Sequence, residues 1–226
     1  MVRSKMLVLN FHGLGPRPDW VGSEEAHFWC DEVSRFHRLL DSVEPTVEAT
    51  EIPIELTFDD GNLSDATIAL PALVERGLTA SFFVCAGRVG DRNYLDGAAL
   101  LELRAAGMNV GSHGWSHIDW RTADDSTLRR EVDDARDKIE QLLGERIQAV
   151  AIPFGSYDRR VLGRLGRFQT VYTSDRGLAR TDRRVMPREA FEVTWPGSAV
   201  SELAVHPKPT MSSIPRRAWS LYKRLR

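Results

Sequence analysis

Short apolar runs rich in β-branched and aromatic residues recur along the chain, and polar or helix-forming stretches separate them. Runs of this length, bounded by turn-forming residues, are typical of buried β-strands. We therefore predict seven strands. They span residues 5–11, 54–58, 79–85, 108–111, 149–152, 170–173 and 190–194.

The segments between these runs carry the period of an α-helix. In residues 124–143, apolar positions recur every three or four residues, charged positions fill the opposite face, and Gly144 follows as a stop signal. Strands that alternate with helices indicate a parallel sheet or barrel, and seven strands favour a barrel. From Thr194 onward the alternation is lost, which predicts an irregular closure of the fold. Further predicted helices span 24–43, 65–76 and 97–106.

The composition is that of an average globular protein, with 42% hydrophobic residues, a formal charge of -2 and a pI near 6.3. Such a balance gives no overall attraction to nucleic acid, so no nucleic-acid partner is predicted. The apolar run at residues 6–9 is too short for a signal-peptide core, and no run has the length of a membrane span. We expect a cytoplasmic protein with one domain over 1–210, followed by a basic tail over 211–226.

Two carboxylates follow the strand predicted at 54–58, namely Asp59 and Asp60, and Gly61 comes next. In a βα barrel the carboxyl ends of the strands share one face, which is the usual place of an active site. One aspartate could bind a metal while the other faces the water that the metal activates. Taken alone, Asp-Asp-Gly is also an ordinary turn signal.

Two histidines, His113 and His117, follow the strand predicted at 108–111. A spacing of four residues lets both rings reach one ion, and imidazole suits zinc and other borderline divalent metals. Such a pair also occurs by chance in solvated turns, but the aspartate pair strengthens the metal hypothesis. One carboxylate and two imidazoles leave coordination positions open for water and substrate, as hydrolysis requires.

The order Thr-Phe-Asp-Asp-Gly, Ser-His-Gly-Trp-Ser-His and Pro-Phe-Gly resembles the NodB-homology domain of polysaccharide deacetylases, the fourth carbohydrate-esterase family. The resemblance covers residues 7–188. It implies an α/β fold in the form of a distorted (β/α)7 barrel. It also implies that Asp60, His113 and His117 hold a divalent metal ion, with Zn²⁺ the first choice, and that Asp59 is the catalytic base.

The third motif contains Pro153 and Phe154, which the resemblance implies are substrate-binding residues, with the Phe154 N–H helping to hold the oxyanion. Judged without the resemblance, this Pro-Phe-Gly segment is equally well a tight turn. Many family members begin this motif with an arginine that tethers the base, but here the position is Ala151. Arg188 could supply the missing cation, and a surface arginine is the alternative.

The general acid has two candidates. The family often uses a late Leu-x-x-His motif, and residues 203–206 match it literally with His206, outside any clear strand. The other candidate is His12, at the end of the first strand, which resembles the strand ending of the exopolysaccharide N-acetylglucosamine deacetylase branch. We favour His12 because a strand end places it on the catalytic face.

The predicted reaction is removal of an N-acyl group, foremost N-acetyl, from an amino sugar or glycan by attack of metal-bound water. A deformylase or a cyclic-amide hydrolase on the same scaffold is an alternative, and so is a non-catalytic carbohydrate-binding barrel. The tail carries several cations with Trp219 and Tyr222, a pattern compatible with weak contact to a membrane surface. A solvated terminus or a helix packed on the barrel is the simpler interpretation of the tail.

Overall fold

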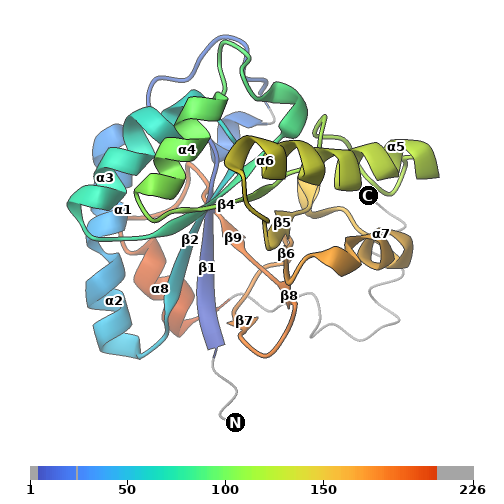
Figure 1. The fold of residues 1–226 in the computed structure, drawn as a ribbon. Helices are drawn as coiled ribbons and strands as arrows, with labels where there is room; N and C mark the ends of the chain where they lie inside the picture. The colour runs from blue at the N-terminus through green and yellow to red at the C-terminus, as the bar shows by residue number, and fades with distance from the viewer. Residues whose placement is uncertain (1–4, 24, 208–226) are drawn as a thin grey trace.

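A sheet of nine strands, nearly closed into a barrel, forms the centre of the protein in a computed structural model that describes residues 5–23 and 25–207 (Figure 1). Seven of its strands are parallel neighbours. In spatial order they are β1 (Lys5–Phe11), β2 (Ile54–Asp60), β3 (Ala80–Val84), β4 (Asn109–Ser112), β5 (Ala149–Ala151), β6 (Thr170–Tyr172) and β8 (Val185–Met186).

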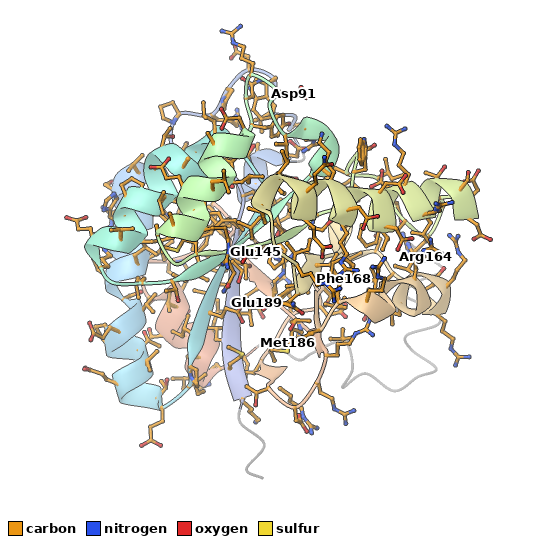
Figure 2. All side chains as sticks on the ribbon, in the orientation of Figure 1. Asp91, Glu145, Arg164, Phe168, Met186 and Glu189 are labelled. Atoms are coloured by element: carbon orange, nitrogen blue, oxygen red, sulfur yellow. The ribbon has the colours of Figure 1, made fainter. Side chains whose placement is uncertain are left out.

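Two further short strands pair with β1. β7 (Ala179–Arg180) lies antiparallel to its beginning, and β9 (Glu189–Ala190) lies parallel to its end. The segment from β8 to β9 therefore pairs first with β6 and then with β1, and so it bridges the two sides of the sheet. Figure 2 labels Met186 and Glu189, which lie at either side of this crossing. Pro187 and Arg188 form the link between them.

Helices cover the outer face of the sheet, and the N-terminal strand enters from the side opposite the long loops (Figure 1). Two of the longer helical segments contain a turn of π-helix, in 65–75 and 125–143. The α-helices are α1 (Val33–Asp41), α2 (Val43–Thr50), α3 (Leu70–Glu75), α4 (Gly97–Ala105), α5 (Asp125–Arg129), α6 (Ala135–Leu143), α7 (Arg159–Arg164) and α8 (Ala199–Val205). The 3-10 and π turns are η1 (Glu25–Phe28), η2 (Asp65–Ala69), η3 (Ala86–Arg88), η4 (Arg130–Asp134), η5 (Pro153–Gly155) and η6 (Leu165–Arg167).

The predicted barrel is confirmed, and six of the seven predicted strands begin and end within two residues of those observed. The seventh, 190–194, is wrong beyond Ala190, because the barrel closes through the two-residue strands β8 and β9 instead. The single helix predicted over 24–43 is also wrong. Cys30 pairs through its backbone with Gly13 and Gly15, which breaks the segment into η1 and α1. The irregular closure predicted after Thr194 contains α8, which packs on α2.

Alternation along the strands decides what reaches the barrel interior. On β1, Leu7, Leu9 and Phe11 join the large core beneath the helices, whereas Val8 belongs to a small cluster inside the barrel. Because successive side chains point to opposite faces of a strand, Asn10 shares the inner face with Val8. The same argument places the Thr57 and Asp59 side chains inside, since Leu56 and Phe58 are in the outer core. Along β1 the inner face therefore changes from apolar to polar toward the carboxyl end, and on β2 it is polar throughout, since Glu55 also points inward and accepts a hydrogen bond from Tyr172.

The described residues contain no helix with the length and apolar character needed to cross a membrane. The two cysteines, Cys30 and Cys85, are both free and buried. The predicted tail, 211–226, lies outside the described residues, and so does the predicted domain boundary at 210. The weak membrane contact attributed to the tail stays a prediction.

Candidate functional site

The predicted site residues gather at the carboxyl ends of the strands, around one cavity of about 710 Å³. β1 leads to His12, β2 to the two aspartates, β4 to the histidine pair and β5 to the Pro-Phe-Gly turn η5. Of the predicted residues, Pro153 is buried at the start of this turn, and His206 is not part of the cavity wall. Those that line the cavity are His12, Asp59, Asp60, His113, His117 and Phe154.

Three of these residues form a compact donor cluster, in which one atom each from Asp60, His113 and His117 lies within 4.8 Å of the others. Asp60 Oδ1 is 3.4 Å from His117 Nε2 and 3.9 Å from His113 Nε2. Two ligands of a tetrahedral zinc ion, each bonded at about 2.1 Å, lie about 3.4 Å apart. The donor types and their spacing thus fit a divalent metal ion of this size.

A hydrogen bond orients the first histidine of the cluster. His113 Nδ1 lies 2.9 Å from the backbone oxygen of Ala151, the last residue of β5. Because a carbonyl oxygen can only accept, Nδ1 carries the proton and Nε2 keeps its lone pair toward the cavity. A backbone carbonyl behind a ligating imidazole is the usual way in which proteins fix such a ring.

Backbone strain is concentrated in the same place. Among the described residues, four non-glycine residues have positive φ, and three of them are Asp60 (78°), His117 (58°) and Phe154 (58°). Left-handed backbone is costly for residues with a Cβ and persists only where the surroundings impose it. The turns that carry two donors of the cluster and the exposed Phe154 ring are therefore held in conformations that the local sequence alone would not favour.

The second aspartate, Asp59, faces a different environment from Asp60. Its two oxygens accept a bidentate pair of hydrogen bonds from Arg188, at 2.8 and 2.7 Å, and Asn10 Nδ2 donates a third at 3.0 Å. Burial by itself would raise the pKa of Asp59, but the charges of Arg188 and of the neighbouring histidines hold that pKa well below its usual value. Asp59 is consequently a buried, ionised and fully oriented carboxylate.

Arg188 is not a surface residue, so the alternative that we considered for it is wrong. Its side chain is 1% exposed, and its guanidinium also donates to Asn10 Oδ1, to the Thr57 hydroxyl and to the Thr173 carbonyl. It reaches Asp59 from the segment that joins β8 to β9. The chain therefore places a buried cation beside Asp59 from a different segment than the third motif, where Ala151 stands.

The two acid candidates lie in different surroundings. His12 is partly buried in the cavity wall beside the Phe28 ring, and its Nδ1 atom is buried without a hydrogen-bond partner among the described residues. Burial lowers the pKa of His12, although the charges of Asp60 and Asp59 oppose that shift. His206 is an exposed residue that ends α8, and α8 packs on α2.

One residue that the sequence analysis did not single out holds the histidine loop in place. Glu131, in η4, is 1% exposed and accepts hydrogen bonds from the backbone N–H groups of Trp115 and Ser116 and from the Trp120 indole. It thereby fixes the loop between His113 and His117. The sequence does contain a signal for Glu131, because position 131 lies on the apolar stripe of the helix predicted over 124–143. A carboxylate at such a buried position needs a hydrogen-bond partner.

The fold and this site together define a barrel with a candidate metal centre and a buried carboxylate beside it. Residues 46–172 match the family described as polysaccharide deacetylase. The chain therefore belongs to the polysaccharide deacetylase family, as the motifs suggested. The matched range contains both aspartates and both histidines but neither His12 nor Arg188.

Similar proteins include the peptidoglycan-N-acetylmuramic acid deacetylase PdaC of Bacillus subtilis, 33% identical over 113 residues, which are 50% of this chain and 23% of PdaC. A chitin deacetylase of Pestalotiopsis sp is 29% identical over 111 residues, 49% of this chain and 37% of that enzyme. The chain spans about half or less of the length of the curated relatives that it matches.

Solved structures of low sequence identity share the fold. The Streptococcus pyogenes deacetylase PplD has a TM-score of 0.77 at 19% identity, covering 92% of this chain and all of PplD (100%). IcaB from Ammonifex degensii has a TM-score of 0.73 at 21% identity, covering 89% of this chain and 97% of IcaB. These likenesses confirm the predicted barrel. The relation to one particular branch of exopolysaccharide deacetylases stays a prediction.

Proposed function

We propose that the protein is a metal-dependent hydrolase that removes an N-acyl group, foremost N-acetyl, from an amino sugar or glycan. One observation carries the proposal: a buried, ionised Asp59 lies next in sequence to Asp60, whose donor cluster opens into the same cavity. Membership of the polysaccharide deacetylase family supports the reaction class, and the names of the relatives support an acetylated carbohydrate as the substrate.

In this proposal Asp60, His113 and His117 hold the ion, and Zn²⁺ is the first choice because it accepts mixed imidazole and carboxylate ligands. A bound divalent ion would polarise the amide carbonyl and lower the pKa of water at the site. In this proposal, side chains of the described residues orient the substrate and transfer the protons.

Asp59 is the proposed general base. A carboxylate offers about four lone-pair positions, and the three hydrogen bonds from Arg188 and Asn10 use three of them. The remaining position is on Oδ1, which accepts one of these bonds whereas Oδ2 accepts two. Because the pKa of Asp59 is lowered, the carboxylate is a weak base, and it would accept a proton only from water whose own pKa a bound divalent ion would lower.

His12 is the proposed general acid, which gives a proton to the departing amine. It follows the strand next to that of Asp59, so the two groups line the same cavity from adjacent strands. The His12 side chain lines the cavity, so it can contact a leaving group there, while its buried Nδ1 atom has no hydrogen-bond partner among the described residues. The Phe154 ring, 58% exposed and 4.5 Å from the His117 ring, provides an apolar wall for the acyl group or sugar.

Elemental analysis of the purified protein, followed by a screen for acetate and formate release with and without chelator, tests the proposal. We expect about one divalent ion per chain and acetate release from N-acetylated sugars that stops on chelation and returns with Zn²⁺. Formate as the main product would instead favour a deformylase. A metal-loaded protein that binds sugars but releases no acid would favour a non-catalytic barrel.

A further inference from the structure

Two aromatic side chains, Trp20 and Tyr94, form an aromatic wall of the cavity. Trp20 and Tyr94 both line it, with their ring centroids 5.7 Å apart and their planes at 48°. Trp20 is 41% exposed, although a tryptophan side chain is among the most strongly favoured for burial. An exposed tryptophan in a cavity wall indicates a surface that a ligand covers.

Trp20 rests on a rigid support. Its ring meets the buried Trp29 ring edge to face at 6.1 Å, and Trp29 Nε1 donates to the Gly15 carbonyl at 2.7 Å. The Trp29 ring occupies the space beside Gly13, where a Cβ atom would come within 1.9 Å of it. The backbone pairing of Gly13 and Gly15 with Cys30 closes the base of this loop.

The loop that carries Tyr94, which precedes α4, is hydrogen-bonded to the segment directly after Asp60. Leu63 N–H donates to the Asn93 carbonyl at 3.0 Å, and Leu95 N–H donates to the Gly61 carbonyl at 2.9 Å. In Figure 1 the loop after β1 and the loop before α4 lie together at the top of the molecule, and Asp91 marks the second of them in Figure 2. Two loops from distant parts of the chain thus build one fixed wall.

Arg88 connects this wall to the donor cluster. Its guanidinium lies 5.0 Å from the centre of the Tyr94 ring, and its NH1 atom is 3.4 Å from Asp60 Oδ1. The aromatic wall is therefore one side chain away from a proposed metal ligand. A ligand whose reacting group sits at the cluster can extend over Trp20 without leaving the cavity.

We propose that Trp20 and Tyr94 form a subsite for a second sugar ring of the glycan, adjacent to the residue that carries the reacting N-acyl group. This inference rests on the proposed function. The apolar C–H face of a pyranose ring covers an indole face and removes it from water, while the ring hydroxyl groups stay hydrated or bond to Arg88. The substrate class is accordingly a linked glycan rather than a free amino sugar.

The test compares the β-1,4-linked tetramer of N-acetylglucosamine with the monomer. Affinities are measured by calorimetry on zinc-loaded Asp59→Asn protein, and kcat/KM ratios on the zinc-loaded parent. We expect the parent to prefer the tetramer at least tenfold, Trp20→Ala to lose about tenfold or more of that ratio, and Trp20→Tyr to recover part of it. Leu101→Ala, at an exposed apolar position of α4 away from the cavity, is the matched control and should keep the ratio.

Equal affinity for monomer and tetramer, failure to bind either, or an unchanged ratio in Trp20→Ala would overturn the subsite. Acyl release from the monomer with no tetramer preference retains the proposed function and removes only the subsite. Binding of the tetramer that depends on Trp20, in a protein that releases no acyl group, retains the subsite and removes the proposed function.

Discussion

Asp59 and Asp60 are neighbours in the chain, yet they belong to opposite kinds of environment. Both oxygens of Asp59 accept hydrogen bonds of 2.7 to 3.0 Å from Arg188 and Asn10 inside the barrel. Asp60 lies at the cavity, with Arg88 and His117 at 3.4 Å and His113 at 3.9 Å. We call Asp59 with Arg188 and Asn10 the closed half of the site, because protein groups bind both carboxylate oxygens. We call Asp60 with His113 and His117 the open half, because its donor atoms are left for a ligand to complete.

This difference follows from the alternation of a strand and the turn after it. Asp59 points inward from the last part of β2, where a buried charge must have a partner. Asp60 ends the strand with a φ of 78°, which turns its carboxylate toward the histidine loop. The comparison teaches that one dipeptide can place one carboxylate in a closed network and the other in an open donor cluster, because strand and turn direct adjacent side chains differently.

Removal of a donor from the open half should have the largest effect. We expect His113→Ala and His117→Ala to abolish stoichiometric metal binding and turnover together. Asp59→Asn should keep the metal and lose turnover, because it changes the closed half only. Metal content by elemental analysis checks this, and a full equivalent of metal in His113→Ala protein would remove the ligand assignment.

Substitution of the acid candidates should have the next largest effect. His12→Ala should lower kcat by about 10²–10⁴-fold, the usual contribution of general acid catalysis. His206→Ala is the control, since His206 is exposed at the end of α8, and its kcat should stay near that of the parent. Steady-state kinetics decides the matter, and the reverse ranking would transfer the role to His206.

Breaking the closed half should show in stability as well as in turnover. Arg188→Met leaves Asp59 buried without its cation, which we expect to lower the free energy of unfolding by about 3–5 kcal/mol. The double variant with Asp59→Asn should regain much of that loss. Arg180→Met, which breaks an exposed pair with Asp182, should change stability by no more than about 0.5 kcal/mol. Urea unfolding measures all three, and a small effect of Arg188→Met would contradict the closed half.

The smallest effect is expected from the support of the histidine loop. Glu131→Gln keeps the shape but weakens the hydrogen bonds to Trp115 and Ser116, so the metal affinity should fall by about 10–100-fold. Glu145→Gln is the control, because Glu145, labelled in Figure 2, is not among the cavity-lining residues and forms an ion pair with Arg104. Competition with a metal-binding dye gives both constants. An unchanged constant for Glu131→Gln would show that the loop keeps its shape without the carboxylate.

The open half could be predicted from the sequence because its signals are local. Asp60, His113 and His117 lie in short motifs directly after apolar strands, and the parallel order of those strands brings the motifs to one face. The barrel itself was predictable for the same reason. Each of its first six strands is long or apolar enough to show a pattern of its own.

The closed half depends on contacts that no local pattern encodes. Arg188 meets Asp59 across 129 positions of sequence, and it lies between two strands of two residues each, too short to show periodicity. The break in the predicted helix over 24–43 has a similar origin. There the fit of the Trp29 ring against Gly13 and the pairing of Cys30 override an apolar stripe that by itself favours a helix.

The closing segment from β8 to β9 also links the environment of the proposed base to the completion of folding. A chain folded only as far as β6 would already contain both aspartates and both histidines, but Asp59 would have no cation. Pairings of long sequence separation form late, since their loop-closure entropy must first be offset. The proposed base therefore acquires its cation in the same event that closes the barrel, and a partly folded molecule that bound an ion would still lack the contact between Arg188 and Asp59.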